Sequence, residues 1–283
     1  MTGNEERSQD GLVGILPSPP PDHPMILKGD PGARLAAPPP YSRFTLSARG
    51  KDPHLPILRF LAREFPHIAI AQVESVFGFV EPCTLYGGRP FGAPELSPRD
   101  IAVMYECGIG LRLPLSNHHV TRDEYERSRS FLARYHRKGN SVITTSEQLA
   151  GWIRSDFPDF EIEASVIKEI DTEEKIAKAL EVYDTVVVPM RLNLDLGFLE
   201  RVAPKERITL FANAGCALTC PSKICYPSFS QANKFTGHET MCSFTLRPRE
   251  LYGMLDFDLD KLSALGFARF KMLRSRSHGL TGF

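Results

Sequence analysis

Short apolar runs that alternate with capped amphipathic helices fill the chain from about Pro66 onward, and this alternation is what most constrains the fold. Three helix starts have the spacing of a capping box, in which a Thr or Asp precedes a Glu or Gln by three positions: Thr121 with Glu124, Thr145 with Gln148, and Asp171 with Glu174. Between the helices we expect strands near 67–74, 109–115, 140–144, 160–166, 184–188, 207–212 and 267–273.

Repeated strand–helix units produce a largely parallel sheet, which either closes into a barrel or is wound on both faces. A doubly wound nucleotide-binding sheet would place a glycine-rich loop after the first strand, but the chain there reads Ser75-Val76-Phe77-Gly78-Phe79. We therefore predict an α/β fold of the TIM-like (β/α) barrel kind, complete or lacking one unit. Chemistry in such a barrel belongs at the carboxyl ends of the strands.

Residues 1–50 have a different composition from the rest, with nine of the 23 prolines and no sustained helix or strand period. A segment of this kind buries too little apolar surface to fold alone. We predict a disordered Pro-rich leader over 1–50 that is dispensable for folding, followed by a barrel domain over 51–283. A Pro-rich docking motif is the alternative interpretation of the leader.

The charge balance and the apolar pattern restrict the cellular setting. Lys plus Arg equals Asp plus Glu at 34 each, so the net charge does not indicate nucleic acid as a partner, although a local basic patch could still bind it. The first ten residues lack the apolar core of a signal peptide, and no apolar stretch is long enough for a membrane span. We expect a cytoplasmic protein with no membrane association, in which thiols stay reduced.

A cluster of cysteines is the main chemical signal, because Cys216, Cys220, Cys225 and Cys242 lie in one stretch over 213–242, beyond the sixth expected strand. Four thiolates from such a loop can hold an iron–sulfur cluster or a tetrahedral zinc ion. The spacing matches neither the paired C-x-x-C units of zinc ribbons nor a bacterial ferredoxin run, so structural thiols are the alternative.

Two further residues bear on this hypothesis. His238 precedes Cys242 by four positions and could replace it, giving a Cys₃His zinc site as the chief rival to a cluster. Cys107 is isolated on the apolar side of an expected helix, where we expect it to pack in the core.

Polar residues at expected strand ends supply candidate catalytic groups. Asn117 and His118 follow the second strand, where barrel loops carry such groups, and a histidine there could act as a general base, a ligand or a hydrogen-bond donor. The alternative is a loop that merely precedes the Thr121 cap. Glu163 alternates with apolar neighbours on the fourth strand, so we expect it to point inward, unless the strand end is open to water. An inward carboxylate would need a cationic partner such as Lys168, Arg191 or Lys271.

The βα units, the run NAGCALTCPSKICYP with the later Cys242, and the closing GFARFKMLRSR together resemble the peptidase U32 family of TIM-barrel proteins, over about residues 66–276. The resemblance to its relatives among oxygen-independent hydroxylases implies that Cys216, Cys220, Cys225 and Cys242 bind a [4Fe–4S] cluster. It also implies a substrate at the barrel mouth and a protein partner or electron donor. The cysteines of that family are usually spread more widely, and many of its members are longer.

Two other functions remain open at this point. The first is a non-enzymatic, Zn²⁺-stabilised module that binds RNA or a protein through basic residues, namely Lys223, Lys234, Arg247, Arg249, Arg274 and Arg276. The second is a hydrolase, as the peptidase name suggests. The sequence contains no G-x-S-x-G elbow and no H-E-x-x-H helix, which ranks hydrolysis last.

Overall fold

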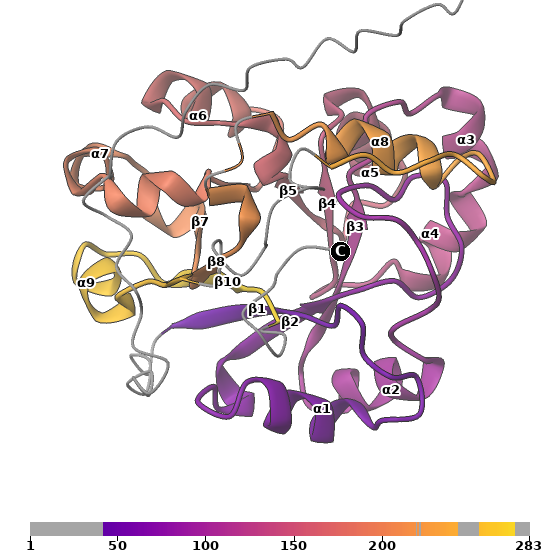
Figure 1. Ribbon diagram of the computed structural model, residues 1–283, viewed down its shortest axis with the longest axis horizontal. Coiled ribbons are helices and arrows are strands. Elements are labelled where there is room, and N and C mark those ends of the chain that lie inside the picture. Colours follow the sequence, from indigo (N-terminus) through magenta and orange to yellow (C-terminus); the bar gives the residue numbers. More distant parts are fainter. Residues whose placement is uncertain (1–41, 219, 221, 243–254, 275–283) are drawn as a thin grey trace, which may run out of the picture. The chain divides into compact units, whose positions relative to one another are not determined.

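The computed structural model describes residues 42–218, 220, 222–242 and 255–274 of the 283-residue chain. Eight parallel strands close into a barrel in the order β1-β10-β7-β6-β5-β4-β3-β2 (Figure 1). The TIM-like (β/α) barrel expected from the sequence is confirmed, and it is closed. The strands are β1 (Arg43–Ser47), β2 (Val73–Phe77), β3 (Gly110–Leu115), β4 (Ser141–Thr144), β5 (Glu161–Ala164), β6 (Thr185–Val187), β7 (Ile208–Phe211) and β10 (Arg269–Met272).

Helices follow the strands and lie around the outside of the barrel (Figure 1). A small antiparallel pair, β8 (Asn213–Ala214) with β9 (Leu255–Asp256), is separate from the barrel sheet. The helices are α1 (Ile57–Glu64), α2 (Pro98–Glu106), α3 (Arg122–Arg127), α4 (Arg129–Tyr135), α5 (Glu147–Asp156), α6 (Glu173–Ala179), α7 (Leu196–Arg201), α8 (Cys225–Ala232) and α9 (Leu259–Ala264).

The first barrel strand lies inside the segment that we expected to be a leader, and this corrects the boundary at residue 50. Phe44 and Leu46 of β1 are fully buried, and Thr45 Oγ1 lies 3.0 Å from Ser75 Oγ of β2. The strand has only five residues in which polar and apolar side chains alternate, and it lies beside a proline-rich stretch, so the local sequence pattern was too weak to predict it. The strand is instead held by β2 and β10, which are distant in sequence. Residues 1–41 lie outside the described part.

The expected strand over 67–74 is also wrong in its position. Residues Ile70–Gln72 form a short 3₁₀ helix, with Ile70 exposed, and β2 starts only at Val73. The alternation of apolar and small residues before Val73 is compatible with a strand as well as with a short helix, so the sequence pattern alone could not separate the two. The other six expected strands each overlap an observed barrel strand.

Helix caps follow the predicted chemistry closely. Thr121 accepts a hydrogen bond from the Glu124 amide in a complete capping box, as expected. The caps of α5 and α6 are Ser146 and Thr172, each one residue later than we expected. The chemistry of the caps was therefore readable to within one residue.

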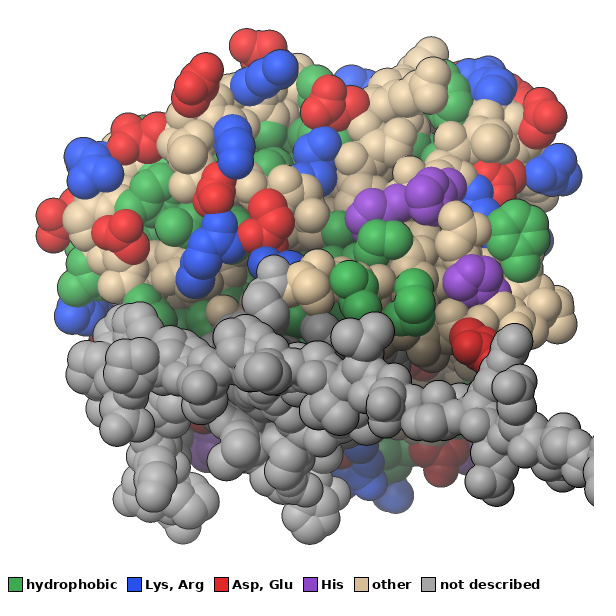
Figure 2. Space-filling view, turned by 45° about the horizontal axis from the view of Figure 1, so that its top comes forward, with side chains coloured by type: hydrophobic (Ala, Val, Ile, Leu, Met, Phe, Trp, Pro, Cys, Tyr) green, Lys and Arg blue, Asp and Glu red, His purple; other side chains and the backbone are tan. Residues whose placement is uncertain are grey.

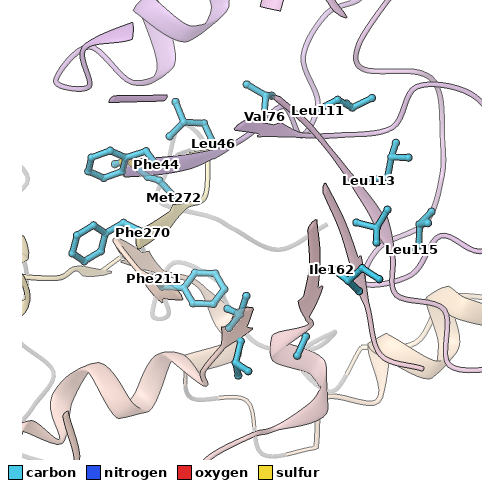
Figure 3. Packing of buried hydrophobic residues seen from close by; sticks show 14 of the residues in the cluster. Phe44, Leu46, Val76, Leu111, Leu113, Leu115, Ile162, Phe211, Phe270 and Met272 are labelled. Carbon is cyan, nitrogen blue, oxygen red and sulfur yellow. The ribbon is translucent and has the colours of Figure 1, made fainter. Parts of the chain in front are cut away.

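Apolar side chains on the outer surface of the strands pack against the helices and form the main core. Phe44 of β1 stacks on Phe270 of β10 with ring centroids 5.7 Å apart, which joins the first and last strands. Figure 3 shows how members of this layer lie along the strands, among them Val76, Leu111, Leu113, Leu115 and Ile162. Burial of this layer is the main stabilising term for the fold.

Candidate functional site

A pocket opens at the carboxyl ends of the barrel strands, where barrel enzymes carry their chemistry. Apolar side chains form most of its wall, including Phe77, Pro114, Ile143 and Phe211 at strand ends. Reactive or charged side chains in the lining are of two kinds. The thiols are those of Cys216, Cys220, Cys225 and Cys242, and the cations are Arg49, Arg89, Lys223 and Lys271. No Asp, Glu or His is among the described residues of the lining.

The four cysteines that the sequence singled out all line this pocket. Cys216 begins a 3₁₀ turn that follows β8, and Cys225 is the first residue of α8. Cys220 accepts a hydrogen bond from the Lys223 amide at 3.3 Å, and Lys223 has a positive φ of 48°, which marks a tight turn. Cys220 and Cys225 line the same pocket as Cys242, which follows α8 in the chain.

The thiols also act on one another electrostatically. Burial, with smaller contributions from the nearby negative charge that Cys216, Cys220 and Cys242 would carry, raises the pKa of Cys225 to about 12. Four thiolates would therefore repel one another strongly without a compensating cation. Among the described residues, no three His, Cys, Asp or Glu side chains lie close enough together to share one metal ion.

Cys83, Cys107 and His238 are not among the described residues that line the pocket. Cys107 ends α2 and is exposed, so the expectation that it packs in the core is wrong; the helix turns this residue outward at its carboxyl end. Cys83 is partly buried, 3.9 Å from Ser128 Oγ. His238 is exposed, with its Nδ1 2.9 Å from the Glu239 carbonyl oxygen, and it is not among the lining residues that the structure describes.

Asn117 follows β3 as expected, but its side chain faces backbone rather than the pocket. Its amide nitrogen donates to the carbonyl oxygens of Thr84, Tyr86 and Ser230, at 2.9, 3.1 and 2.9 Å. The side chain is fully buried. These contacts tie α8 to the loops after β2 and β3, and its neighbour Ser116 lines the pocket instead. A catalytic role of Asn117 stays a prediction.

His118 also contacts α8. Its backbone amide donates to Ser230 Oγ at 3.1 Å, and its Nδ1 lies 3.1 Å from the same oxygen. Burial, with a smaller contribution from His119, lowers the pKa of His118, so the ring is neutral at pH 7. The structure places it beside the pocket-forming helix and not in the described lining, and its catalytic role stays a prediction.

Glu163 points into the barrel and is fully buried, as expected from the alternation along β5. Its cationic partner is Arg112 of β3, with Nη1 2.8 Å from Oε2, and Thr209 Oγ1 donates to the same oxygen at 2.9 Å. Burial acts to raise the pKa of Glu163, but Arg112, Lys271 and Arg269 together outweigh it and lower the pKa. Glu163 is therefore an ionised member of a paired network.

That network continues toward the amino ends of the strands. Arg269 pairs with Glu161 and lies 3.4 Å from Glu74, and Arg112 is also 3.7 Å from Glu74. We call these five residues, Glu74, Arg112, Glu161, Glu163 and Arg269, the interior charge network. It fills the barrel below the pocket.

The basic residues considered for RNA or protein binding are held by local acids where the structure describes them. Lys223 pairs with Glu169, Lys234 with Glu124 at 2.7 Å, and Arg274 with Glu64 at 2.9 Å; Arg247, Arg249 and Arg276 lie outside the described residues. Figure 2 shows acidic and basic side chains interspersed on the face that it displays. The described basic residues therefore form no single-sign surface there.

Sequence reasoning missed two pocket cations, Arg49 and Arg89, while Lys271 was named only as a candidate partner of Glu163. Lys271 carried a usable signal, because it alternates with the apolar Phe270 and Met272 on the last strand and must face the opposite side. Arg49 and Arg89 lie in loops after β1 and β2, where no local pattern shows which way a side chain points.

Together these features define a (β/α)-barrel protein with a thiol-lined pocket at the carboxyl end. The structure is similar to a solved structure described as that of the U32 peptidase Mk0906, with a TM-score of 0.53 and 15% sequence identity. The match covers 88% of this chain and 98% of the other, so the two proteins share a fold. No protein-family model and no curated protein matches this sequence. None of the described helices has the length and apolar character required to cross a bilayer.

Proposed function

We propose that Cys216, Cys220, Cys225 and Cys242 bind a [4Fe–4S] cluster at the mouth of the barrel, and that the chain is a U32-like modifying enzyme of the oxygen-independent hydroxylase kind. The observation that supports this most is the convergence of all four cysteines on one pocket at the carboxyl ends of the strands. In a (β/α) barrel this is the position for a reactive group.

The chemistry of the donor set fits such a cluster. Thiolates are the ligands of [4Fe–4S] clusters, and four are required. The mutual repulsion that raises the pKa of Cys225 disappears when iron binds the sulfurs. Arg49, Arg89 and Lys223 also line the pocket, although Arg89 is paired with Glu95 and Lys223 with Glu169.

When bound, the cluster would supply electron transfer to a substrate in the pocket. The chain's own residues would shape that substrate's site. Phe77, Phe211 and Phe229 present aromatic surface to the pocket, which binds a flat apolar molecule and excludes water. An external electron donor, most simply a protein, is part of this proposal.

A Zn²⁺ ion held by the same thiols is the second candidate, and it would make the loop a structural module. Zinc requires each sulfur about 2.3 Å from one ion, whereas a cluster gives each thiolate its own iron and so needs the sulfurs further apart. Among the described residues no three donors surround one point, although four thiols share the pocket.

The test is anaerobic purification, followed by measurement of iron, sulfide and zinc and of visible absorption. We expect about four iron atoms per chain and a broad absorption band that bleaches on reduction. Serine at Cys216, Cys220, Cys225 or Cys242 should remove most of the iron, while Cys107→Ser, at an exposed thiol outside the pocket, should not. One zinc per chain with no iron would replace this proposal by the zinc module.

A further inference from the structure

Lys271 differs from the other cations of the pocket, because it lies within a barrel strand, β10, whereas the others lie in loops. The residue lies between Thr45 of β1 and Phe211 of β7 in the sheet register, and its carbonyl oxygen accepts a hydrogen bond from the Ala212 amide at 2.8 Å. The side chain is 7% exposed and lines the pocket. Its backbone is therefore held on both sides while its amine faces the cavity.

The amine has no acidic partner at contact distance within the described structure. Its close neighbour is the ring of Phe77, with Nζ 4.6 Å from the centroid. The charged groups that act on it are Glu163 and Arg112, which are already paired with each other at 2.8 Å. A buried lysine normally has its charge paired, so an unpaired one in a pocket calls for a functional explanation.

We propose that Lys271 is a nucleophile that forms an imine with a carbonyl substrate, an aldehyde or ketone with an apolar body. Desolvation of a lysine in an apolar pocket activates its amine for this reaction. The walls of the pocket, including Phe77, Ile143 and Phe211, suit an apolar substrate body and keep bulk water from hydrolysing the imine.

The protonation state agrees with this geometry. Burial is the main reason that the pKa of Lys271 is lowered to about 8; Glu163 opposes the shift, and Arg112 makes a smaller contribution in the same direction as burial. With that pKa roughly one amine in ten is neutral at pH 7, compared with fewer than about one in a thousand for an ordinary lysine.

The reaction balances without any further reagent. The neutral amine attacks the carbonyl carbon, a C–N bond replaces the C–O π bond, and the nitrogen passes a proton to the oxygen. The resulting carbinolamine then loses water as the C=N bond forms, with the second amine proton leaving in that water. This step needs no electrons from a cluster, so the inference goes beyond the proposed function and does not rest on it.

The experiment traps the imine with sodium cyanoborohydride in the full-length protein, using 3-phenylpropanal and 4-methyl-2-oxopentanoate as probes, followed by peptide mass spectrometry. We expect about one probe per chain, mapped to Lys271, with a rate that rises with pH around an apparent pKa near 8. Lys271→Met should lower labelling at least tenfold. Lys261→Met, at an exposed lysine of α9, is the matched control and should leave labelling unchanged.

Two outcomes would overturn the inference. One is labelling spread over exposed lysines while Lys271 stays unmodified in the wild-type protein, a result that needs no variant to fold. The other is an unchanged labelling rate in Lys271→Met. Iron content is measured in the same samples and should not change in this variant, so a failure of imine formation and a failure of cluster binding can be told apart.

Discussion

The two halves of the barrel interior differ sharply although the same eight strands build both. Toward the amino ends, the interior charge network pairs every acid with an arginine, as in Glu163 with Arg112 and Glu161 with Arg269. Toward the carboxyl ends, the described lining holds thiols, cations and aromatic rings but no acid. The comparison indicates that the paired charges at the amino ends stabilise the barrel, whereas the pocket at the carboxyl ends is suited to bind a ligand. Substitutions in each half can test these two roles separately.

The largest expected effect is at the amino ends of the strands. Glu163→Gln removes the charge that Arg112 needs while keeping the shape of the side chain. Breaking a buried ion pair from one side leaves a charge that Glu74, 3.7 Å from Arg112, compensates only in part, so we expect the free energy of unfolding to fall by about 3–5 kcal/mol. Urea unfolding of this variant and of Glu174→Gln, at an exposed residue of α6, would measure it.

The double variant Arg112→Met with Glu163→Leu sharpens this prediction. It replaces both charges by apolar side chains of similar size, so it should recover most of the lost stability. If Glu163→Gln alone costs less than about 1 kcal/mol, the network does not stabilise the barrel in the way described.

A somewhat smaller effect tests whether β1 belongs to the barrel. Leu46 is fully buried, and Leu46→Ala should lower the free energy of unfolding by about 3 kcal/mol because it leaves a cavity in the core. Leu58→Ala on α1, where the side chain is 36% exposed, should cost under about 1 kcal/mol. If Leu46→Ala and Leu58→Ala had equal effects in thermal or urea unfolding, residues 43–47 would be a dispensable leader and not a strand of the barrel.

The next effect concerns Asn117, which lies at the carboxyl ends of the strands but is bonded like a structural residue. Asn117→Ala removes a hydrogen bond from three carbonyl oxygens, of which only that of Tyr86 keeps a side-chain donor within the described residues, Asn233 Nδ2 at 3.0 Å, so we expect a loss of about 2 kcal/mol in unfolding free energy. Iron content should stay near the wild-type level. Full stability combined with lost activity would instead favour the catalytic role first predicted for Asn117.

The smallest effect on stability is expected at the thiols. Cys225→Ser changes one partly exposed atom, so in metal-free protein the unfolding free energy should move by less than about 1 kcal/mol. The same variant should lose its iron. A large loss of stability without metal would mean that the thiol packs as a structural group, which was the alternative from sequence.

Local patterns explain what could be predicted from the sequence. The apolar runs around Leu113, Val142 and Ile162 are continuous enough to mark buried strands, and the Thr121 cap is a local hydrogen-bond pattern. The cysteine cluster was also visible, because its members are close in sequence. Each of these features depends on residues within a few positions of one another.

The features that were missed depend on residues far apart. Arg112 as the partner of Glu163 could not be read from the chain, because the contact joins the interiors of β3 and β5. Lys271 was among the expected partners of Glu163, but its position beside Phe77 in the pocket could not be read from the chain. The position of β1 likewise depends on β10, which the chain supplies last.

The pairing of β1 with β10 has a consequence for how the chain matures in the cell. These strands come from opposite ends of the domain, and β1 cannot gain its second neighbour until β10 has been synthesised. Contacts of such long sequence separation slow folding. During translation the cysteine loop would leave the ribosome before the barrel can close around its pocket. Premature oxidation of the four thiols would thus be a hazard for the nascent chain, and loading of any metal would have to await completion of the last strand.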